Sequence, residues 1–188
     1  MRRTVLVSIA AATLLLSGCS DSGGEEAGPS GTPTASASSE ATEPTPSEPA
    51  VEPASGFLID LDRVRMNAPE GWKKNDPLST FLLQVDDPKS FSHVSLSDLS
   101  AVGEPSLDEL AQFTVDERKR SQKHDPVEIA GVEWYHVSGP NDRYTRFEQF
   151  GTSHHGSLAV IEFLLDLDLP EAEQQQIIDS VLASVEWK

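Results

Sequence analysis

The stretch from Leu158 to Leu165 constrains the fold of this chain more than any other. It reads Leu-Ala-Val-Ile-Glu-Phe-Leu-Leu, so it is apolar at both alternate sets of positions. Successive side chains of a strand point to opposite faces, so such a run needs cover on both sides. The sequence therefore predicts a central strand with packing layers above and below it.

Other short runs are typical of strands, and turn signals separate most of them. The run at 63–68 alternates, placing Val64, Met66 and Ala68 on one face. Because short turns join successive runs, we expect a mainly antiparallel sheet. The runs are residues 57–61, 63–68, 80–85, 91–97, 127–130, 132–138, 143–150 and 158–165, with Val185 and Trp187 in a last extended piece.

Two segments change to helical spacing. Ser106 is followed three residues later by Glu109, the pattern of a capping box, and a second helix is expected to open at Pro170. A basic cluster, Arg118-Lys119-Arg120-Lys123, is expected to close the first helix, with a docking patch as the alternative. The fold class predicted is α+β, a mainly antiparallel sheet with two packed helices. The expected buried stripes are Leu107, Leu110, Ala111, Thr114 and Val115 in the first helix, and Ile177, Ile178, Val181 and Leu182 in the second.

The segment from Ser20 to Ser55 differs sharply from the rest. It consists mainly of Ser, Thr, Pro, Gly, Ala and acidic residues, and it has no Lys or Arg. Such a composition buries too little apolar surface to offset the entropy of ordering, so we expect a disordered tether at residues 19–55. The prolines and like charges favour an extended chain. It would serve as a stalk or as a plain spacer.

The first residues have the layout of a secretory signal. Two arginines precede a short apolar run from Val5 to Leu16, too short for the roughly 20 residues of a spanning helix. The tetrad Leu16-Ser17-Gly18-Cys19 resembles the lipobox of bacterial lipoproteins. The resemblance implies a signal peptide at 1–18, cleavage between Gly18 and Cys19, and lipidation of Cys19 by a diacylglycerol and a further acyl chain such as palmitate. The alternatives are an uncleaved membrane helix, cleavage elsewhere and a core helix.

Charge narrows the range of partners. The formal net charge is −17, and removal of residues 1–18 would take away two arginines and no acid. A chain this acidic lacks the basic face that nucleic acid requires, and anionic head groups repel it. We therefore expect the N-terminal lipid, and not a basic surface, to hold it to the extracytoplasmic face of a cell membrane. Cys19 is the only cysteine, so it has no intramolecular disulfide partner.

The order of several short motifs resembles a known fold. The residues are Ala68-Pro69-Glu70-Gly71-Trp72, the hairpin signal Ile129-Ala130-Gly131, and a final helix running into Ser184-Val185-Glu186-Trp187. Residues 56–188 thus look like the PsbP-like α/β/α sandwich, in the branch of actinobacterial surface lipoproteins and DcrB-like periplasmic proteins. The resemblance implies turn roles for the glycines, packing roles for the tryptophans, and no catalytic residues. Members are mostly accessory or binding proteins of envelope, photosystem or transport machinery.

Few residues suggest chemistry. The sequence has no Gly-x-Ser-x-Gly, P-loop, GxGxxG or His-Glu-x-x-His pattern, and nothing indicates a cofactor. His154 and His155, in an expected hairpin loop at 151–156, are the best metal candidates, with help from His93 or His136; solvated histidines are the alternative.

Two further groups of charged residues have a plain and a functional interpretation. Arg143 and Arg146, with Tyr144, could bind an anion, but ion pairs with neighbouring glutamates are the simpler account. The acids at 86–87 and 166–168 do not follow the calcium-loop pattern, and we expect them to be ordinary loop acids.

We therefore expect a lipid-anchored, non-enzymatic envelope protein that binds a lipid, a glycolipid or a protein partner. The alternatives are a metal-dependent or hydrolytic enzyme that uses the His154/His155 loop, and a structural wall spacer. A concave apolar pocket between sheet and helix would favour binding over the spacer role.

Overall fold

The computed structural model describes residues 51–75 and 79–188. The expected signal peptide, the lipobox and the tether up to residue 50 lie outside these residues. The elements, in chain order, are β1 (Leu58–Asp60), β2 (Val64–Asn67), β3 (Lys73–Lys74), β4 (Leu82–Asp86), β5 (His93–Ser100), α1 (Leu107–Glu117), β6 (Gln122–Ile129), β7 (Val132–Pro140), β8 (Thr145–His154), β9 (Ser157–Asp166), α2 (Glu171–Leu182) and β10 (Glu186–Trp187).

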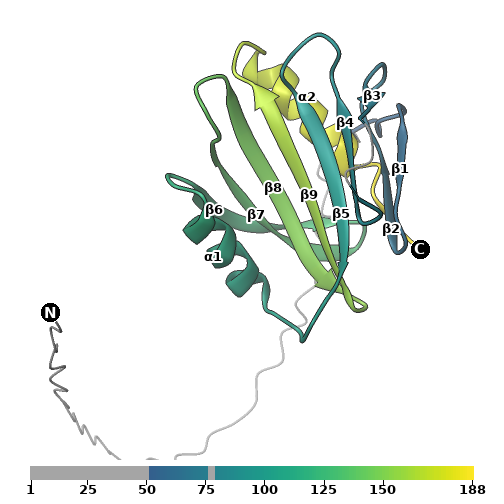
Figure 1. The fold of residues 1–188 in the computed structure, drawn as a ribbon, viewed down its shortest axis with the longest axis vertical. Coiled ribbons are helices and arrows are strands. Elements are labelled where there is room, and N and C mark those ends of the chain that lie inside the picture. Colours follow the sequence, from purple (N-terminus) through teal and green to yellow (C-terminus); the bar gives the residue numbers. More distant parts are fainter. Residues whose placement is uncertain (1–50, 76–78) are drawn as a thin grey trace, which may run out of the picture. The chain divides into compact units, whose positions relative to one another are not determined.

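A seven-stranded sheet forms the middle of the domain, in the order β3-β4-β5-β9-β8-β7-β6 (Figure 1). Every pairing in it is antiparallel. β9 is the central strand, as its two-sided apolar run predicts. Its odd-numbered residues from Ala159 to Leu165 are fully buried on one face, and Leu158, Val160 and Leu164 are half-buried on the other.

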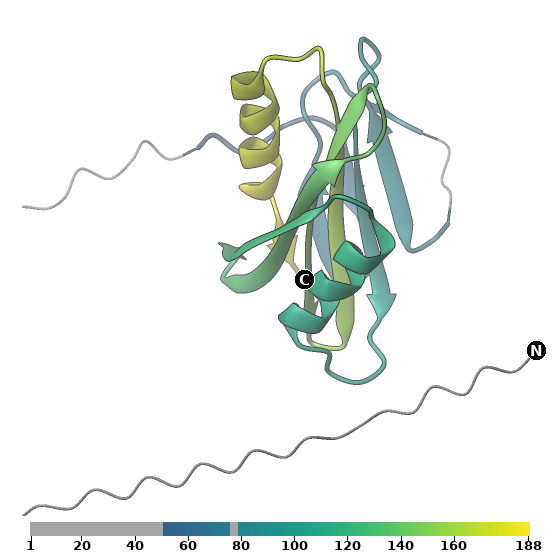
Figure 2. The same cartoon turned by 90° about the vertical axis from the view of Figure 1, so that its left-hand side faces the viewer.

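The two helices pack on opposite faces of this sheet (Figure 2). Ile178 and Val181 of α2 share a large apolar core with Phe150 and Phe163 of the sheet. Ala111 of α1 packs with other residues of the opposite face, which form a smaller core: Tyr135, Val137 and Phe147. The α+β fold with a mainly antiparallel sheet and two packed helices is thus confirmed.

A second, three-stranded sheet, β1-β2-β10, lies on the same side as α2 (Figure 1). Val64 and Met66 of β2 are fully buried in the core that also contains α2, while Arg65 is exposed and pairs with Glu186. The alternation predicted for residues 63–68 is confirmed. This small sheet covers one end of the large core. In it β2 pairs with β1 near the start of the described residues and with β10 at their end.

The first described residues already contact the domain. The backbone N–H of Ala54 donates to the carbonyl of Ser180 in α2 at 2.8 Å, and Ala54 is buried. The boundary expected between residues 55 and 56 therefore falls within a stretch that packs on α2.

The start of α1 and the β6–β7 turn follow the sequence closely, and the β8–β9 turn differs. The capping box of α1 is present, with Ser106 and Glu109 each bonding the other's backbone N–H. Ala130 and Gly131 form the tight β6–β7 turn with φ of 51° and 75°. The loop expected at 151–156 is shorter than predicted, because β8 runs on to His154 and only His155 and Gly156 turn, with φ of 48° and 75°.

The basic cluster begins at the end of α1, as the sequence suggested, but only its first residue, Arg118, caps the helix. The helix ends at Glu117, no basic residue lies in its last turn, and Lys123 belongs to β6. Arg118 caps the helix and donates to Glu162 of β9 at 2.6 Å. Lys123 pairs with Asp108. Side-chain partners on neighbouring elements, and not the helix dipole, account for these two positions.

We predict that Phe163→Ala will lower the free energy of unfolding by about 3–5 kcal/mol, because Phe163 is fully buried on the central strand. Urea unfolding followed by tryptophan fluorescence measures the change. Phe113→Ala is the matched control: Phe113 is 68% exposed on α1, and we expect a change within about 0.5 kcal/mol. Equal losses at the two positions would contradict the assigned core.

Candidate functional site

A pocket of about 430 Å³ opens between α2 and the edge of the large sheet at β6 and β7. Its volume lies within the range of small-molecule binding sites. Its position is the one that a binding role requires, between a sheet and a helix. Its apolar lining consists of Val127, Ile129, Ala130, Phe150, Ile178, Leu182, Ala183 and Val185, and its polar lining of Glu128, His136, Gln175 and Asp179.

A bulge in β6 shapes the sheet side of the pocket. Pairing of β6 with β7 shifts register between His124 and Val127, at Pro126. A bulge bends its strand, and proline is tolerated there because an edge residue need not donate to a neighbour. Val127, the first residue after the shift, is also the first residue of β6 that lines the pocket.

Stacked rings form the wall of the pocket on the sheet side. His136 of β7 lies over Phe150 of β8, with ring centroids 4.4 Å apart and planes 17° apart. On its other side His136 stacks on His124 of β6 at 4.3 Å. The row of rings crosses three strands, and two of its members, His136 and Phe150, line the pocket.

A buried charged row continues from His136 beneath α2. Glu148 is only 5% exposed, and its carboxylate contacts both His136 Nε2 and the Arg146 guanidinium. Arg146 also donates to the Gln174 side chain of α2 at 3.1 Å. Burial, together with the positive charge of Arg146, lowers the pKa of His136 to about 4. At neutral pH His136 is therefore an uncharged part of the pocket wall that donates to Glu148.

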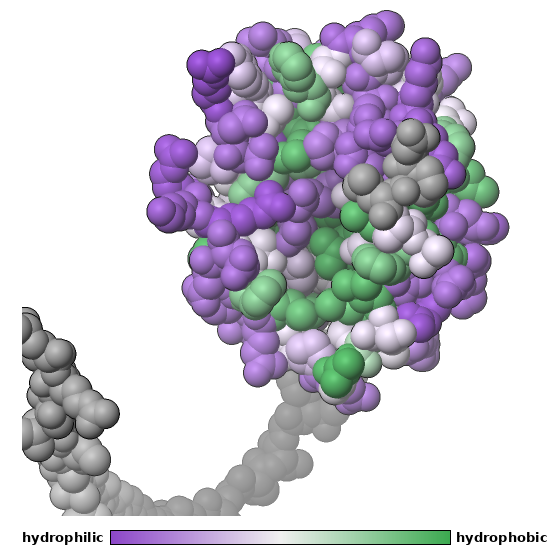
Figure 3. Space-filling model, in the orientation of Figure 1, coloured by the Kyte–Doolittle hydropathy of each residue, from purple (hydrophilic) through white to green (hydrophobic). Residues whose placement is uncertain are grey.

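Two other hollows of similar size lie elsewhere on the domain, one with an acidic and one with a mainly apolar lining. One of about 450 Å³ lies where residues 52–55 cross α2, and its lining includes the acids Glu52, Glu70 and Glu173. Another of about 400 Å³ lies beside α1, where Phe113, Leu158 and Val160 leave apolar surface on the sheet. Figure 3 shows apolar side chains gathered on this face of the domain.

The structure places His154 and His155 side by side at the β8–β9 turn, with ring centroids 3.9 Å apart. His154 also lies against Trp187, at 4.8 Å. The suggested helpers are elsewhere: His136 faces α2 from β7, and His93 of β5 lies opposite Leu164 on the α1 face. Within residues 51–75 and 79–188, no group of three or more His, Cys, Asp or Glu side chains is placed to hold a metal ion.

Arg143 and Arg146 do not form one patch. The guanidinium of Arg143 stacks over the ring of exposed Tyr144 at 4.4 Å, on the surface of the domain. Arg146 points under α2 and pairs with Glu148 on its own strand. Glu128 and Glu133, two further glutamates of nearby strands, instead lie opposite each other on β6 and β7.

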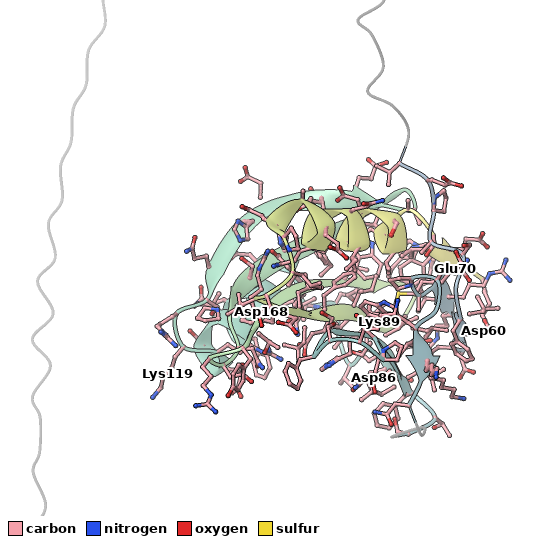
Figure 4. All side chains as sticks on the ribbon, turned by 90° about the horizontal axis from the view of Figure 1, so that it is seen from above. Asp60, Glu70, Asp86, Lys89, Lys119 and Asp168 are labelled. Atoms are coloured by element: carbon pink, nitrogen blue, oxygen red, sulfur yellow. The ribbon has the colours of Figure 1, made fainter. Side chains whose placement is uncertain are left out.

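The acids at 86–87 and 166–168 lie where strands end, because Asp86 is the last residue of β4 and Asp166 the last residue of β9. Asp86, at the end of β4, accepts from Asn75 and Gln84, at 2.8 and 2.6 Å (Figure 4). Asp166 accepts from the backbone N–H of Phe91 and of Asp168, at 3.1 and 2.9 Å. Asp86 and Asp166 are therefore strand-end residues and not the loop acids that the sequence suggested, and their bonds tie the strand ends to neighbouring groups.

The sequence patterns do not predict the pocket. From them His136 is only a possible helper of a metal site, and Asp179 and Val127 have no expected role. The one available signal was Asp125-Pro126, a break ahead of an apolar strand. It marks the bulge, but the second wall comes from a helix more than forty residues later in the chain.

The known proteins that are similar to this chain are solved structures. No family model matches the sequence, and no curated protein matches it. Among solved structures, a Bacteroides thetaiotaomicron protein is 13% identical with a TM-score of 0.47, covering 66% of this chain and 45% of that one. This chain therefore spans less than half of that protein.

Two other solved structures are similar to this chain. The cyanobacterial PsbP (CyanoP) of a Synechocystis species is 13% identical, with a TM-score of 0.48 over 66% of this chain and 86% of that one. LpqN of Mycobacterium tuberculosis, described as involved in cell envelope biogenesis, is 12% identical, with a TM-score of 0.41 over 66% of this chain and 83% of that one. In the described part of the chain, no helix has the length and apolar character needed to cross a membrane.

We predict that the domain loses stability as the pH falls from about 6.5 toward about 4, in part through His136. In the unfolded chain His136 takes up a proton near pH 6.5, whereas burial and Arg146 delay this in the folded state. The stabilisation is therefore complete above the unfolded pKa and lost as the pH falls. It amounts to at most about 3 kcal/mol.

Urea unfolding of the wild type and of His136→Gln, at about pH 7 and about pH 4, measures the effect. Glutamine keeps a donor for Glu148 and does not titrate. His93 and His154, whose pKa values are also lowered, are common to both proteins and cancel in the difference. His124 stacks on His136, which contributes to the lowered pKa of His124, so the difference reports the two stacked rings together. The same loss of stability in both proteins would show that His136 is not responsible.

Proposed function

We propose that this chain is a lipid-anchored envelope protein that binds an apolar ligand, a lipid or glycolipid, in the pocket between α2 and the β6–β7 edge. The pocket is the observation on which the proposal rests: about 430 Å³, mostly apolar, with a few polar groups at its rim. A spacer needs no such pocket, so its presence favours binding over a purely structural role.

The location follows from the sequence. We propose a signal peptide at 1–18, cleavage between Gly18 and Cys19, lipidation of Cys19, a tether from Cys19 to the stretch around Ala54 that packs on α2, and a binding domain beyond it. Two or more acyl chains make a stable anchor, and the acidic chain offers the membrane no basic surface in their place. The origin would be a bacterium, and the actinobacterial surface lipoproteins are the group that the motifs resemble.

We propose no catalytic role. The His154/His155 pair is the best candidate for an enzyme, but its rings are at an exposed turn with Trp187 and away from His93 and His136. The charged groups next to the pocket, Arg146 and Glu148, are engaged with each other under α2. A binding role explains the same pocket without a reactive group.

We predict that Ala183→Phe weakens ligand binding at least tenfold. Ala183 is exposed at the end of α2 and lines the pocket, so a phenyl ring there occupies the space without disturbing the core. The measurement is fluorescence titration with the uncharged probe N-phenylnaphthylamine, on the full mature chain with Cys19→Ala so that no attached lipid competes.

Ala172→Phe is the matched control. It makes the same change in the first turn of α2, at an exposed residue that lines none of the hollows described above. We expect wild-type affinity for this variant. Equal effects of the two substitutions, or no probe binding by the parent chain, would count against the pocket as the binding site.

We also predict that Cys19→Ala releases the chain from the membrane fraction, because the anchor would depend on lipid at this one residue. Fractionation of cells that express either form, followed by immunoblotting, measures the distribution. A cytosolic protein as marker checks that the cells were broken evenly. Retention of the variant in the membrane fraction would rule out the proposed anchor.

A further inference from the structure

Three connections meet at one end of the large sheet and leave apolar side chains in solvent. They are the β4–β5 loop, the β7–β8 turn and the β9–α2 loop (Figure 1), and they carry Phe91, Tyr144 and Leu167. Phe91 is 69% exposed, Tyr144 48% and Leu167 50%. We call these three residues the apolar tip.

The apolar tip is one surface and not three separate side chains. The rings of Phe91 and Tyr144 stack with centroids 5.9 Å apart. The backbone N–H of Leu167 donates to the carbonyl of Tyr144 at 2.8 Å, and the backbone N–H of Phe91 donates to the Asp166 carboxylate at 3.1 Å. These bonds hold the three exposed side chains next to one another. An exposed apolar group that is gathered in this way and rimmed by polar residues marks an interaction site.

Two cations stand beside the tip. The Arg143 guanidinium lies 4.4 Å from the centre of the Tyr144 ring, and Lys89 is exposed on the β4–β5 loop (Figure 4). Neither has an ion pair among residues 51–75 and 79–188. The acids of the same loops bond the backbone instead: Asp87 accepts from the N–H of Lys89 at 2.9 Å, and Asp142 from that of Tyr144 at 2.7 Å.

The place where the chain enters the domain points to a membrane as the occupant of this surface. Glu52 and Pro53, near the start of the described residues, line one hollow together with Asp87 of the β4–β5 loop and Leu169 of the β9–α2 loop. The expected tether therefore joins the domain beside two of the three connections that form the tip. A chain anchored at Cys19 through about 30 residues can bring this end of the domain onto the surface that holds it.

The chemistry of the tip suits the boundary between lipid head groups and acyl chains. A ring with a polar group at one end, such as that of Tyr144, is typical of this boundary. Arginine and lysine keep their charge among the head groups while their stems cover apolar surface. The whole chain is acidic, so burial of apolar surface and not charge has to drive the contact. A contact that is weak in free solution becomes occupied once a tether holds the two surfaces close together.

We propose that the apolar tip docks on the phospholipid surface to which the chain is anchored. Phe91 and Leu167 enter the boundary between head groups and acyl chains, and Arg143 and Lys89 lie among the head groups. This inference rests on the proposed function only in placing the chain at a membrane, and it does not depend on the α2 pocket. A protein partner is the competing occupant.

The test holds the full mature chain on phosphatidylcholine vesicles through a hexahistidine tag ahead of residue 19 and a nickel-chelating lipid. With Cys19→Ala, a single new cysteine carries the dye nitrobenzoxadiazole. Asp168→Cys places it at an exposed residue next to Leu167. Val102→Cys places it at a 97% exposed residue beside the β8–β9 turn, at the opposite end of the sheet. We expect emission from position 168 to rise at least twofold on the vesicles, because the dye leaves water for the apolar boundary, and emission from position 102 to stay unchanged.

A double variant connects the response to the tip. Phe91→Ser with Leu167→Ser removes most of its apolar surface and should return the dye at position 168 to its emission in solution. Phe113→Ser with Val102→Ser is the matched control: it replaces one aromatic and one aliphatic residue that are 68% and 97% exposed, away from the tip. We expect this control to keep the full response.

The outcomes separate this inference from the proposed function. Equal emission at position 168 on vesicles and in solution overturns docking of the tip on lipid and favours a protein partner. An equal rise at positions 168 and 102, or a rise that survives the Phe91/Leu167 variant, overturns the apolar tip as the docking surface. Because the nickel lipid replaces the natural anchor, neither result bears on lipidation of Cys19 or on ligand binding in the α2 pocket.

Discussion

Burial of β9 on both faces is the constraint on which the rest of this domain depends. Phe163 and Ile161 face the α2 core, and Leu164 faces the core beneath α1. A strand that is apolar on both sides requires two layers, and the chain provides one helix for each. The three-stranded sheet adds to the α2 layer, which makes that core the larger of the two.

The unequal layers account for where a ligand site can form. α2 packs its buried side, Ile178 and Val181, against the central strands, and the bulged end of β6 lies beyond it. The space left between helix and edge strand is lined by apolar side chains because it continues the core outward. The charged row of Arg146, Glu148 and His136 keeps its polar atoms satisfied by mutual bonds, so it can underlie the pocket without water.

Local patterns predicted the local features. The two-sided run gave the central strand, Ser106 and Glu109 gave the start of α1, and Ala130-Gly131 gave the tight turn, because each depends on neighbouring residues. The end of α1 beside Arg118 was predicted, but the bond from Arg118 to Glu162 was missed, because that partner belongs to a strand far along the chain. The pocket was missed for the same reason: periodicity shows which face of α2 is buried, but not how far that face extends past the strand at the edge.

The edge strands of the large sheet, β3 and β6, affect whether neighbouring molecules can join their sheets when they are crowded together. β3 has only two residues, and β6 carries Pro126, a register shift and the charged residues Lys123, Asp125 and Glu128. Short, charged, proline-containing or bulged edges resist pairing with the strand of another molecule. Anchoring at Cys19, as proposed above, would bring neighbouring molecules together far more often than free solution does. With both edges protected in this way, such dense packing would not turn separate domains into a continuous β-sheet.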